Sequence, residues 1–461
     1  MAPLLAAKLA VARSAGALSR LRGTGATSLP GRVLLRLEPG AIAELGARLP
    51  EGSATISATN GKTTTAAMAA GILARHGVAL VHNRAGANMA GGVATTLLDA
   101  ARSADGIDGS LGLFEVDELW LERVARELHP RAIVLGNLFR DQLDRYGELE
   151  SIADSWQKLL LESDGQAVLN ADDPLLADLG RERPGTVFFG VQDDTLALPG
   201  LAHAADAKHC RNCGAPYVFD AVYLGHLGRY HCPSCGRRRP EPEVLATDVR
   251  LEGVRASRFT LTTAAGSTTV RLALPGLYNV YNALAAAALG SVLGVPLEAI
   301  VAGLEDSTPA FGRAETVTLG SPQGPRQMQI LLVKNPAGAN EVLRTLALEP
   351  GRHRLLGVLN DRIADGRDVS WIWDADFELL ADRVAGAVCS GTRAADLAAR
   401  LKYAGVDERL IVVEPDLATA LARASSEVEA GEALYALPTY TAMLALRELL
   451  ADRGEVAGRW S

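Results

Sequence analysis

Short apolar runs alternate with longer segments whose apolar residues recur every three to four positions through most of the chain after residue 50. Runs at 112–116 and 131–137 are predicted to be buried strands, and the Ala-rich segment at 65–75 is predicted to be a helix. Strands that alternate with helices are typical of an α/β protein with parallel sheets. The predicted fold class is therefore α/β. The same alternation returns near the C-terminus, with strands expected at 329–334, 354–359, 386–391 and 409–414.

Two breaks divide this alternation into parts. Residues 306–315 contain Pro and Gly between a helical segment and a strand, which indicates a junction between domains. Residues 207–240 interrupt the rhythm of the first domain and are predicted to be an insertion. We therefore expect an N-terminal basic amphipathic segment (1–50), a larger α/β domain (51–308) and a smaller C-terminal α/β domain (309–461).

The N-terminal segment is predicted to form an amphipathic helix. It has no acidic residue before Glu38. A helix packed on the main domain, a transit peptide and weak attachment to an anionic membrane surface would all show this pattern. The sequence leaves these three alternatives open. The basic residues of the segment are Lys8, Arg13, Arg20, Arg22, Arg32 and Arg36.

Composition narrows the function classes. The chain has 461 residues, of which 48% are hydrophobic and 22% charged, and its net charge is −8. General nucleic-acid binders usually carry a basic excess, so this class is disfavoured. No uninterrupted apolar run is long enough to span a bilayer. Four of the five cysteines form two C-x-x-C pairs, which suits a metal in a reducing compartment better than disulfides.

The strongest candidate for chemistry in the first domain is a strand–turn–helix at residues 52–68. Backbone N–H groups at such a helix start bind phosphate, and Gly61 lets the backbone come close. Lys62 is expected to be exposed to the ligand and to reach the terminal phosphates, with the Thr63 hydroxyl on Mg²⁺. Ile56 occupies the first glycine position of the generic motif, so the turn alone is a weak signal. The expected nucleotide contacts are Thr59, Asn60, Gly61, Lys62, Thr63 and Thr64.

Polar residues follow the two strands predicted next. Glu115 and Asp117 come at the end of one strand, and Asn137 comes at the end of the other. Ligands of open α/β sheets collect at the carboxyl ends of strands. Glu115 is thus a candidate Mg²⁺ ligand, and the alternative is that the acidic residues simply form a solvated loop.

The insertion at 207–240 carries two C-x-x-C pairs, each beside a glycine and turn residues. Two such pairs supply the four thiolates of a tetrahedral zinc site. Four protein ligands leave no open position, so the site should be structural. The nearby His209, His226 and His231 are expected to be surface residues, and the lone Cys389 a buried apolar side chain. The predicted zinc ligands are Cys210, Cys213, Cys232 and Cys235.

Five ordered motifs resemble the ATP-dependent Mur ligase superfamily over nearly the whole chain after residue 50. These enzymes use ATP to convert a carboxylate to an acyl-phosphate, which an amine then attacks. The resemblance implies that 51–308 is a Mur-ligase-like ATP-binding domain and that Asn282 and Arg313 also contact the nucleotide. Asn279 is expected to cap its helix. The motifs are ATNGKTTT (58–65), NLFRDQLDRYGE (137–148), LNADDP (169–174), GLYNVYNALAA (276–286) and FGRAE (311–315).

Two C-terminal stretches narrow the resemblance. Residues 332–343 and 360–378 look like the MurT-type subunit of lipid II isoglutaminyl synthase. In that family the subunit pairs with a GatD-type glutamine amidotransferase, and the heterodimer amidates the D-glutamate α-carboxylate of the peptidoglycan precursor lipid II with ammonia from glutamine. The resemblance implies ATP, Mg²⁺ and Zn²⁺ as cofactors. It also implies a cytoplasmic location, with the inner face of the plasma membrane as an option.

The sequence departs from the amino-acid-adding Mur ligases at several positions. Ala58 replaces a glycine, Gln142 stands where a metal-binding histidine is usual, and a D-Y-A-H-N-P block reads LVKNPA at 332–337. Each change fits a subunit that accepts ammonia. Two alternatives remain: a stand-alone Mur or folylpolyglutamate-type ligase that adds an amino acid, and a zinc-ribbon scaffold with a vestigial nucleotide site.

Asp368 is the third catalytic candidate, beside Lys62 and Glu115. A loop aspartate is usually a cap or turn former. In MurT-like subunits, however, the aspartate of this block resembles the third member of a catalytic triad, donated to the Cys–His pair of the partner. Asp365, Asp374 and Asp376 are nearby alternatives.

Overall fold

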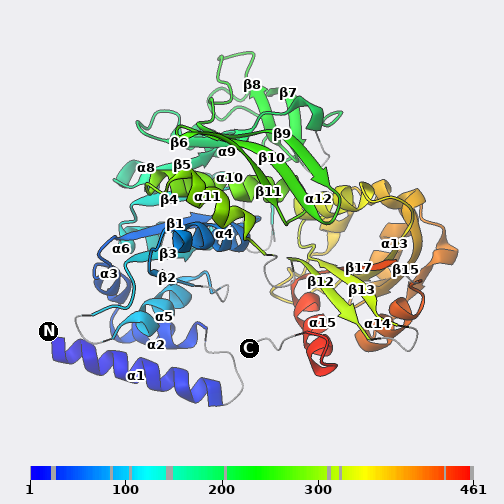
Figure 1. Cartoon of the computed structure of the whole chain (residues 1–461), viewed down its shortest axis with the longest axis horizontal. Helices are drawn as coiled ribbons and strands as arrows, with labels where there is room; N and C mark the ends of the chain where they lie inside the picture. The colour runs from blue at the N-terminus through cyan, green and yellow to red at the C-terminus, as the bar shows by residue number, and fades with distance from the viewer. Residues whose placement is uncertain are drawn as a thin grey trace.

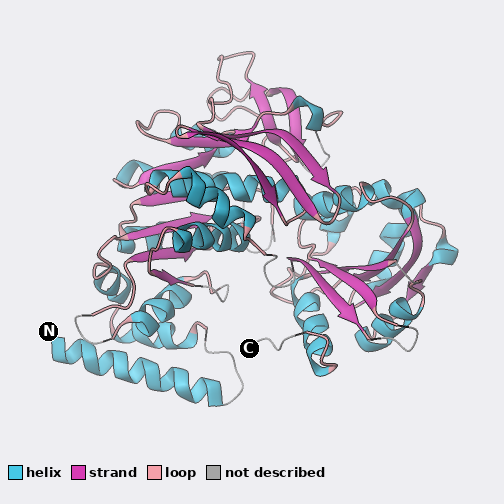
Figure 2. Cartoon of the chain, in the orientation of Figure 1, coloured by secondary structure: helices cyan, strands magenta, loops and turns pink. Residues whose placement is uncertain are grey.

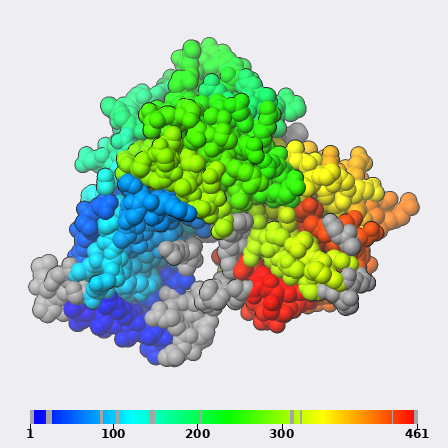
Figure 3. Space-filling view, in the orientation of Figure 1, coloured from blue at the N-terminus to red at the C-terminus, as the bar shows by residue number. Residues whose placement is uncertain are grey.

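The structure is a computed structural model with two α/β sheets side by side (Figure 1). The predicted fold class is thereby confirmed. In the space-filling view, green residues join the two halves across the top, and a hollow separates them below (Figure 3). The structure describes residues 2–21, 27–83, 87–102, 106–141, 149–201, 205–308, 313–320, 324–429 and 432–456.

The first sheet has nine strands in the order β11-β10-β9-β6-β5-β4-β1-β3-β2. The seven strands β9-β6-β5-β4-β1-β3-β2 pair in parallel, whereas β9, β10 and β11 form an antiparallel meander that the sequence did not predict (Figure 2). The strands are β1 Ser53–Ser57, β2 Leu80–His82, β3 Leu111–Glu115, β4 Ala132–Leu135, β5 Gln166–Asn170, β6 Val187–Val191, β9 Val244–Glu252, β10 Ala256–Thr263 and β11 Gly266–Leu272.

Every residue of the central strands β1, β3 and β4 is buried, because helices cover both faces of the sheet. One face packs on α4 (Lys62–Arg75), α10 (Leu277–Val292) and α11 (Leu297–Glu305). The other face packs on α5 (Ala90–Ala100), α6 (Leu121–Leu128), α8 (Leu149–Glu162) and α9 (Pro174–Gly180).

The second sheet has six strands in the order β12-β13-β17-β14-β15-β16, all parallel except β12 against β13. The expected domain division at 308/309 stays a prediction. The strands are β12 Arg313–Leu319, β13 Arg326–Leu331, β14 His353–Val358, β15 Val384–Ser390, β16 Ile411–Val413 and β17 Ala433–Pro438. The α-helices are α12 Pro336–Ala347, α13 Ala394–Tyr403, α14 Leu417–Ser426 and α15 Tyr440–Asp452.

The N-terminal helices pack against the first sheet's helical layer. In α1 (Ala2–Leu21), Leu5, Leu9 and Ala12 join the core that contains α5. Two basic residues of α1 are engaged within the chain, since Lys8 Nζ lies 2.7 Å from Glu38 Oε2 and Arg13 donates to the Leu98 carbonyl at 3.0 Å. Of the three alternatives for this segment, packing on the main domain is the one observed. None of the helices in the described part of the chain is both long and apolar enough to cross a membrane.

Helix α2 (Leu29–Leu37) lies in backbone contact with α5. The Gly31 N–H donates to Thr95 Oγ1 at 2.9 Å, and a Cβ atom added to Gly31 would meet the Gly91 carbonyl oxygen at 1.9 Å. Only glycine allows this approach, so the glycines at 31 and 91 fix how closely the N-terminal helices dock.

We expect Gly31→Ala to destabilise the protein by about 1–3 kcal/mol, because the new methyl group must push two helices apart. Urea unfolding measures this change. Gly40→Ala is the matched control, since an added Cβ there would meet only Glu38 Oε1, at 4.0 Å. Equal midpoints for the two variants would show that the helix contact is dispensable.

Candidate active site and metal centre

The turn between β1 and α4 lies at the carboxyl edge of the first sheet. Gly61 is the N-cap of α4 and has φ +86°, a conformation that side chains rarely adopt. A Cβ atom at this position would meet Asn282 Oδ1 at 2.0 Å. The structure therefore brings α10 directly against the turn, and two of the predicted nucleotide contacts lie together.

Lys62 is largely buried, yet it lines a pocket at this edge of the sheet, so its expected exposure to the ligand stays a prediction. Its ammonium group lies 2.7 Å from Glu118 Oε2 and also donates to the Ala58 carbonyl oxygen. Burial lowers the pKa of Lys62, but the charge and hydrogen bond of Glu118 outweigh it, and the net pKa lies above its ordinary value. The side chain folds back because the loop after β3 places a carboxylate within its reach.

The two candidate Mg²⁺ ligands lie in contact. Thr63 Oγ1 donates to Glu115 Oε1 at 3.0 Å, and Asn88 Nδ2 lies 3.4 Å from the same oxygen. Asn83 fixes the backbone of Glu115 from both sides, with hydrogen bonds of 2.8 and 2.9 Å. Glu115 is thereby held at the start of α4, and its acidic neighbour Asp117 is buried as well.

The β4 edge holds the same turn by amide hydrogen bonds. Asn60 N–H donates to Asn137 Oδ1 and Asn137 Nδ2 donates to the Asn60 carbonyl, both at 2.9 Å. Phe139 N–H donates to Thr59 Oγ1 at 3.0 Å. The predicted strand-end residue Asn137 thus positions the turn directly.

The second sheet also reaches the turn, through Lys334 and Asn335. Lys334 Nζ lies 3.0 Å from the Thr59 carbonyl and 2.7 Å from Asp141 Oδ2. Asn335 exchanges amide hydrogen bonds of 3.3 and 3.0 Å with Asn60. Sequence reasoning compared this block with the Mur ligases but missed both residues as site residues. Their place just after an apolar strand was the available signal.

Helix α10 provides the predicted Asn282, which accepts a hydrogen bond from Thr65 Oγ1 at 3.2 Å. The expectation that Asn279 caps this helix was wrong. Gly276 is the N-cap, and Asn279 Nδ2 donates to the Pro275 carbonyl at 2.7 Å, because the sharp turn at Gly276 starts the helix three residues earlier.

The backbone of Arg313 begins β12, and its side chain lies outside the described part of the structure. Gln142 also lies outside it.

These segments enclose a pocket of about 400 Å³. Both sheets contribute to its lining. Residues 59–64 of the turn and Glu115 line the pocket together with Lys334, Gly338 and Glu341, which lie in or just before α12. The rest of the pocket lining includes five apolar or aromatic side chains: Phe139, Leu224, Leu227, Leu274 and Tyr281.

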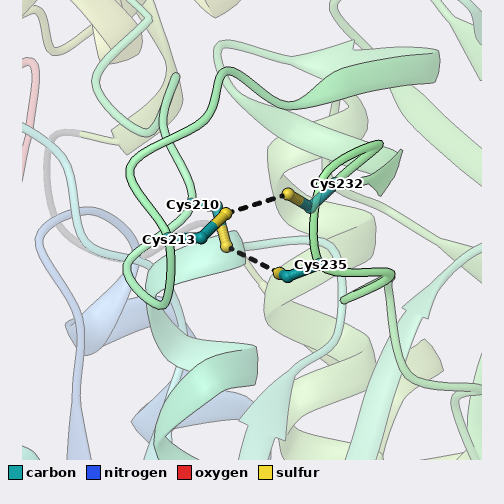
Figure 4. A group of neighbouring side chains, drawn as sticks. All are labelled: Cys210, Cys213, Cys232 and Cys235. Atoms are coloured by element: carbon teal, nitrogen blue, oxygen red, sulfur yellow. Dashed lines mark hydrogen bonds between the residues drawn. The ribbon is translucent and has the colours of Figure 1, made fainter.

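The four predicted zinc ligands converge in the insertion (Figure 4). Their sulfur atoms all lie within 4.8 Å of one another, with 3.6 Å between Cys210 and Cys235 and 3.4 Å between Cys213 and Cys232. The glycine after each pair, Gly214 or Gly236, has φ +75°. The two turns therefore have matching backbones that aim four thiols at one point.

The predicted burial of Cys389 is confirmed, whereas the predicted surface position of the nearby histidines fails for one of them. Cys389 is fully buried as expected, and burial raises its pKa to about 12. His209 is exposed and His231 is half-buried. His226 was wrongly expected at the surface: it is completely buried, with its ring centroid 4.6 Å from that of Phe139, because the insertion folds its tip inward.

Asp368 is exposed on a loop of the second sheet, outside the pocket. Its carboxylate accepts a hydrogen bond from the Ser370 N–H at 2.8 Å, and hydrogen bonds from Ser370 lower its pKa. Of the alternatives, Asp365 is buried and accepts a hydrogen bond from the Thr441 N–H at 2.7 Å, whereas Asp374 is exposed. The structure leaves Asp368 and Asp374 accessible to another molecule.

Comparison with known proteins identifies the family. Residues 332–443 match the model of the MurT ligase C-terminal region, and residues 56–214 match that of the Mur ligase middle domain. The lipid II isoglutaminyl synthase (glutamine-hydrolyzing) subunit MurT of Streptococcus pneumoniae is 34% identical over 95% of this chain and 94% of its own. This chain belongs to the MurT family. The MurT subunit of Staphylococcus aureus strain N315 is 32% identical over 95% of this chain and 96% of its own.

Solved structures support the same fold at lower identity. A pseudomurein peptide ligase type C from Methanothermus fervidus gives a TM-score of 0.65 at 22% identity, covering 88% of this chain and 79% of that one. MurF ligase from Thermotoga maritima, solved in complex with ADP, gives 0.61 at 15% identity, covering 92% and 85%. This chain therefore has a Mur-ligase-like fold.

The buried Lys62–Glu118 pair generates a stability prediction. We expect Lys62→Met to cost about 3–5 kcal/mol, because it leaves the Glu118 carboxylate buried without its partner. Urea unfolding should show this loss, and Lys62→Met/Glu118→Gln should recover part of it. A Lys62→Met protein as stable as the wild type would contradict the pairing.

Proposed function

We propose that this chain is the ATP-dependent ligase subunit of a lipid II isoglutaminyl synthase. It would convert the D-glutamate α-carboxylate of the peptidoglycan precursor to an amide, with ammonia supplied by a GatD-type glutamine amidotransferase in a heterodimer. The observation that carries the proposal is the end-to-end similarity to two MurT subunits whose name states this activity. The pocket between the two sheets supports it.

The phosphate-binding turn is the proposed ATP site. Residues 59–64 present a helix start and Gly61 to the pocket, which suits phosphate oxygens. The Thr63 hydroxyl and the Glu115 carboxylate, 3.0 Å apart, are oxygen ligands that Mg²⁺ prefers. When bound there, Mg²⁺ would neutralise charge on the β- and γ-phosphates.

The proposed reaction needs positive charge beside the transferred phosphoryl group and a site from which water is excluded. The substrate carboxylate attacks the γ-phosphorus of ATP and ADP leaves. Ammonia then attacks the acyl carbon, and the phosphate leaves with the proton that the nitrogen loses, as hydrogen phosphate. The charge that develops on the transferred phosphoryl group needs cations. Among the described residues that line the pocket, Lys62 and Lys334 are the lysines, and they come from different sheets. Docking of the sheets would thus complete the site and exclude water.

The cysteine cluster is proposed to hold zinc. Zn–S bonds of about 2.3 Å place the corners of a tetrahedron about 3.8 Å apart, close to the observed sulfur separations of 3.6 and 3.4 Å. Four thiolates fill the coordination sphere, so the metal would stabilise the insertion and supply no open position for catalysis.

We expect one equivalent of zinc to co-purify with the chain. Cys213→Ser should lose it because three thiolates bind zinc much more weakly, whereas Cys389→Ala should keep it because Cys389 lies in the second sheet. Elemental analysis measures both variants. Zinc absent from the wild type, or retained in Cys213→Ser, would exclude the Cys₄ site.

Asp368 is proposed to complete the partner's catalytic triad. A Cys–His pair needs a third group to fix the imidazole tautomer and stabilise its charged form. Asp368 is exposed, and its lowered pKa keeps it ionised near neutral pH, so it can accept an imidazole N–H from another chain. Glutamine hydrolysis would then require the assembled complex.

Reconstitution with the amidotransferase tests the function and this role together. The wild-type complex should amidate lipid II with ATP and glutamine. Asp368→Asn should lower the glutamine-dependent rate by a factor on the order of 10³ to 10⁴, as in other triads, while amidation driven by ammonium persists. Asp374→Asn, equally exposed six residues away, is the control.

Two outcomes would contradict these proposals separately. A wild-type complex that hydrolyses glutamine and ATP but never yields an amidated precursor would overturn the substrate assignment. Unchanged glutaminase activity in the Asp368→Asn complex, with complex formation confirmed by gel filtration, would place the triad acid elsewhere.

A further inference from the structure

The zinc-bearing insertion extends into the pocket. Its two strands, β7 (Val218–Leu224) and β8 (Leu227–His231), form a hairpin at the top of Figure 1, with Gly225 and His226 as the two-residue loop. The cysteine pairs flank the open end of this hairpin in the sequence. The opposite end is the hairpin tip at residues 224–227, in which Leu224, His226 and Leu227 are buried, and Leu224 and Leu227 line the pocket.

The hairpin tip packs on Phe139. The His226 ring lies 4.6 Å from the Phe139 ring, and a Cβ atom on Gly225 would meet Phe139 Cε1 at 2.8 Å. The His226 Nε2 atom lies 3.5 Å from Asp173 Oδ2. Gly225 and His226 therefore pack directly on one aromatic side chain, and the two leucines belong to the same apolar cluster as Phe139.

Phe139 in turn belongs to the loop that holds the phosphate-binding turn. Its N–H donates to Thr59 Oγ1 at 3.0 Å, and the Thr59 hydroxyl lies 3.2 Å from the Phe139 carbonyl. Asn137, two residues earlier, exchanges hydrogen bonds with Asn60. A shift of Phe139 would move the groups that fix residues 59 and 60.

A second connection joins the end of the insertion to the pocket. Arg239, four residues after Cys235, donates to Asp172 Oδ1, and the pocket-lining Tyr281 donates to Asp172 Oδ2 at 2.6 Å. All three side chains are buried. Asp172 also accepts a hydrogen bond from the Gly228 N–H through its backbone carbonyl at 2.9 Å, so the same residue holds the end of the insertion and the hairpin beside its tip.

We propose that the hairpin tip is a positioning element of the nucleotide pocket, which holds Phe139 and through it the phosphate-binding turn. The zinc site, by tying the outer ends of the two strands, sets the place of this tip. The proposal rests on the assignment of the turn as the ATP site. It gives the insertion a role in nucleotide affinity that is separable from global stability.

Gly225→Ala tests the proposal through binding. The added methyl group displaces Phe139, so we expect the Kd for ADP with Mg²⁺ to rise about tenfold in calorimetric titration, equivalent to about 1.4 kcal/mol. Zinc content and the circular dichroism spectrum should not change. Gly294→Ala is the matched control: its φ of +81° imposes similar backbone strain, and an added Cβ meets nothing within 4 Å. Its Kd should equal that of the wild type.

If Gly225→Ala folds poorly, Leu227→Ala is a second variant in which the effect of the hairpin tip on ADP binding can be measured. Its control is Leu421→Ala, an equally buried leucine in the core of the second sheet. Both lose stability, but only Leu227→Ala should weaken ADP binding. Cys213→Ser should lose zinc and also weaken ADP binding. The rise in its Kd should be smaller than in Leu227→Ala, because the Arg239–Asp172–Tyr281 cluster still holds the insertion.

The outcomes separate the two levels of inference. If the wild type binds ADP and both Gly225→Ala and Leu227→Ala bind it with the same Kd, the role of the hairpin tip alone is overturned. Zinc loss in Cys213→Ser without a change in Kd would overturn the zinc tether. A wild-type protein that binds no ADP would instead overturn the proposed ATP site.

Discussion

The turn at residues 59–61 is held by hydrogen bonds from segments far apart in the sequence. Asn137 binds it from the β4 edge, Asn335 binds it from the second sheet, and the amide of Asn282 fills the space beside Gly61. Amide pairs are directional, so they fix the orientation of the turn as well as its position. The pocket can form only when the two sheets and α10 are docked, and this explains why it lies at their junction.

Charge in the pocket is arranged around that turn. Glu115, Asp117 and Glu118 follow one strand and are buried, and the ammonium group of Lys62 lies against Glu118. Lys334 pairs with Asp141 on the other side of the turn. Buried ion pairs contribute little net stability but are costly to break, so they favour one arrangement over others. Two paired lysines from different sheets are therefore poised beside the proposed phosphate site without destabilising the protein as isolated charges would.

Asp172 and Asp173, the two aspartates of the LNADDP motif, hold segments of the fold together. Asp172 accepts hydrogen bonds from Arg239, Tyr281 and the Val191 N–H, and Asp173 caps α9 and accepts the Leu138 N–H at 2.9 Å. Of these partners, Tyr281 lines the pocket, whereas Asp172 and Asp173 themselves do not. They join the insertion, α10 and the β4 loop, which are the segments that carry pocket-lining residues.

The sequence by itself determined the local features of this protein. Apolar periodicity located β1, β3 and β4 of the first sheet and β13 to β16 of the second. Gly61 and its neighbours marked the turn, and the cysteine spacing specified a four-thiol cluster, because each of these patterns depends on neighbours within a few residues. The same strand-end logic that selected Glu115 and Asn137 could have selected Lys334. Only the tertiary structure decided that Lys62 is paired with Glu118, that His226 is buried on Phe139, and that Lys334 and Asn335 reach the turn. These contacts join residues between 56 and 275 positions apart, and their geometry follows from how sheets and insertion pack, which no local pattern encodes.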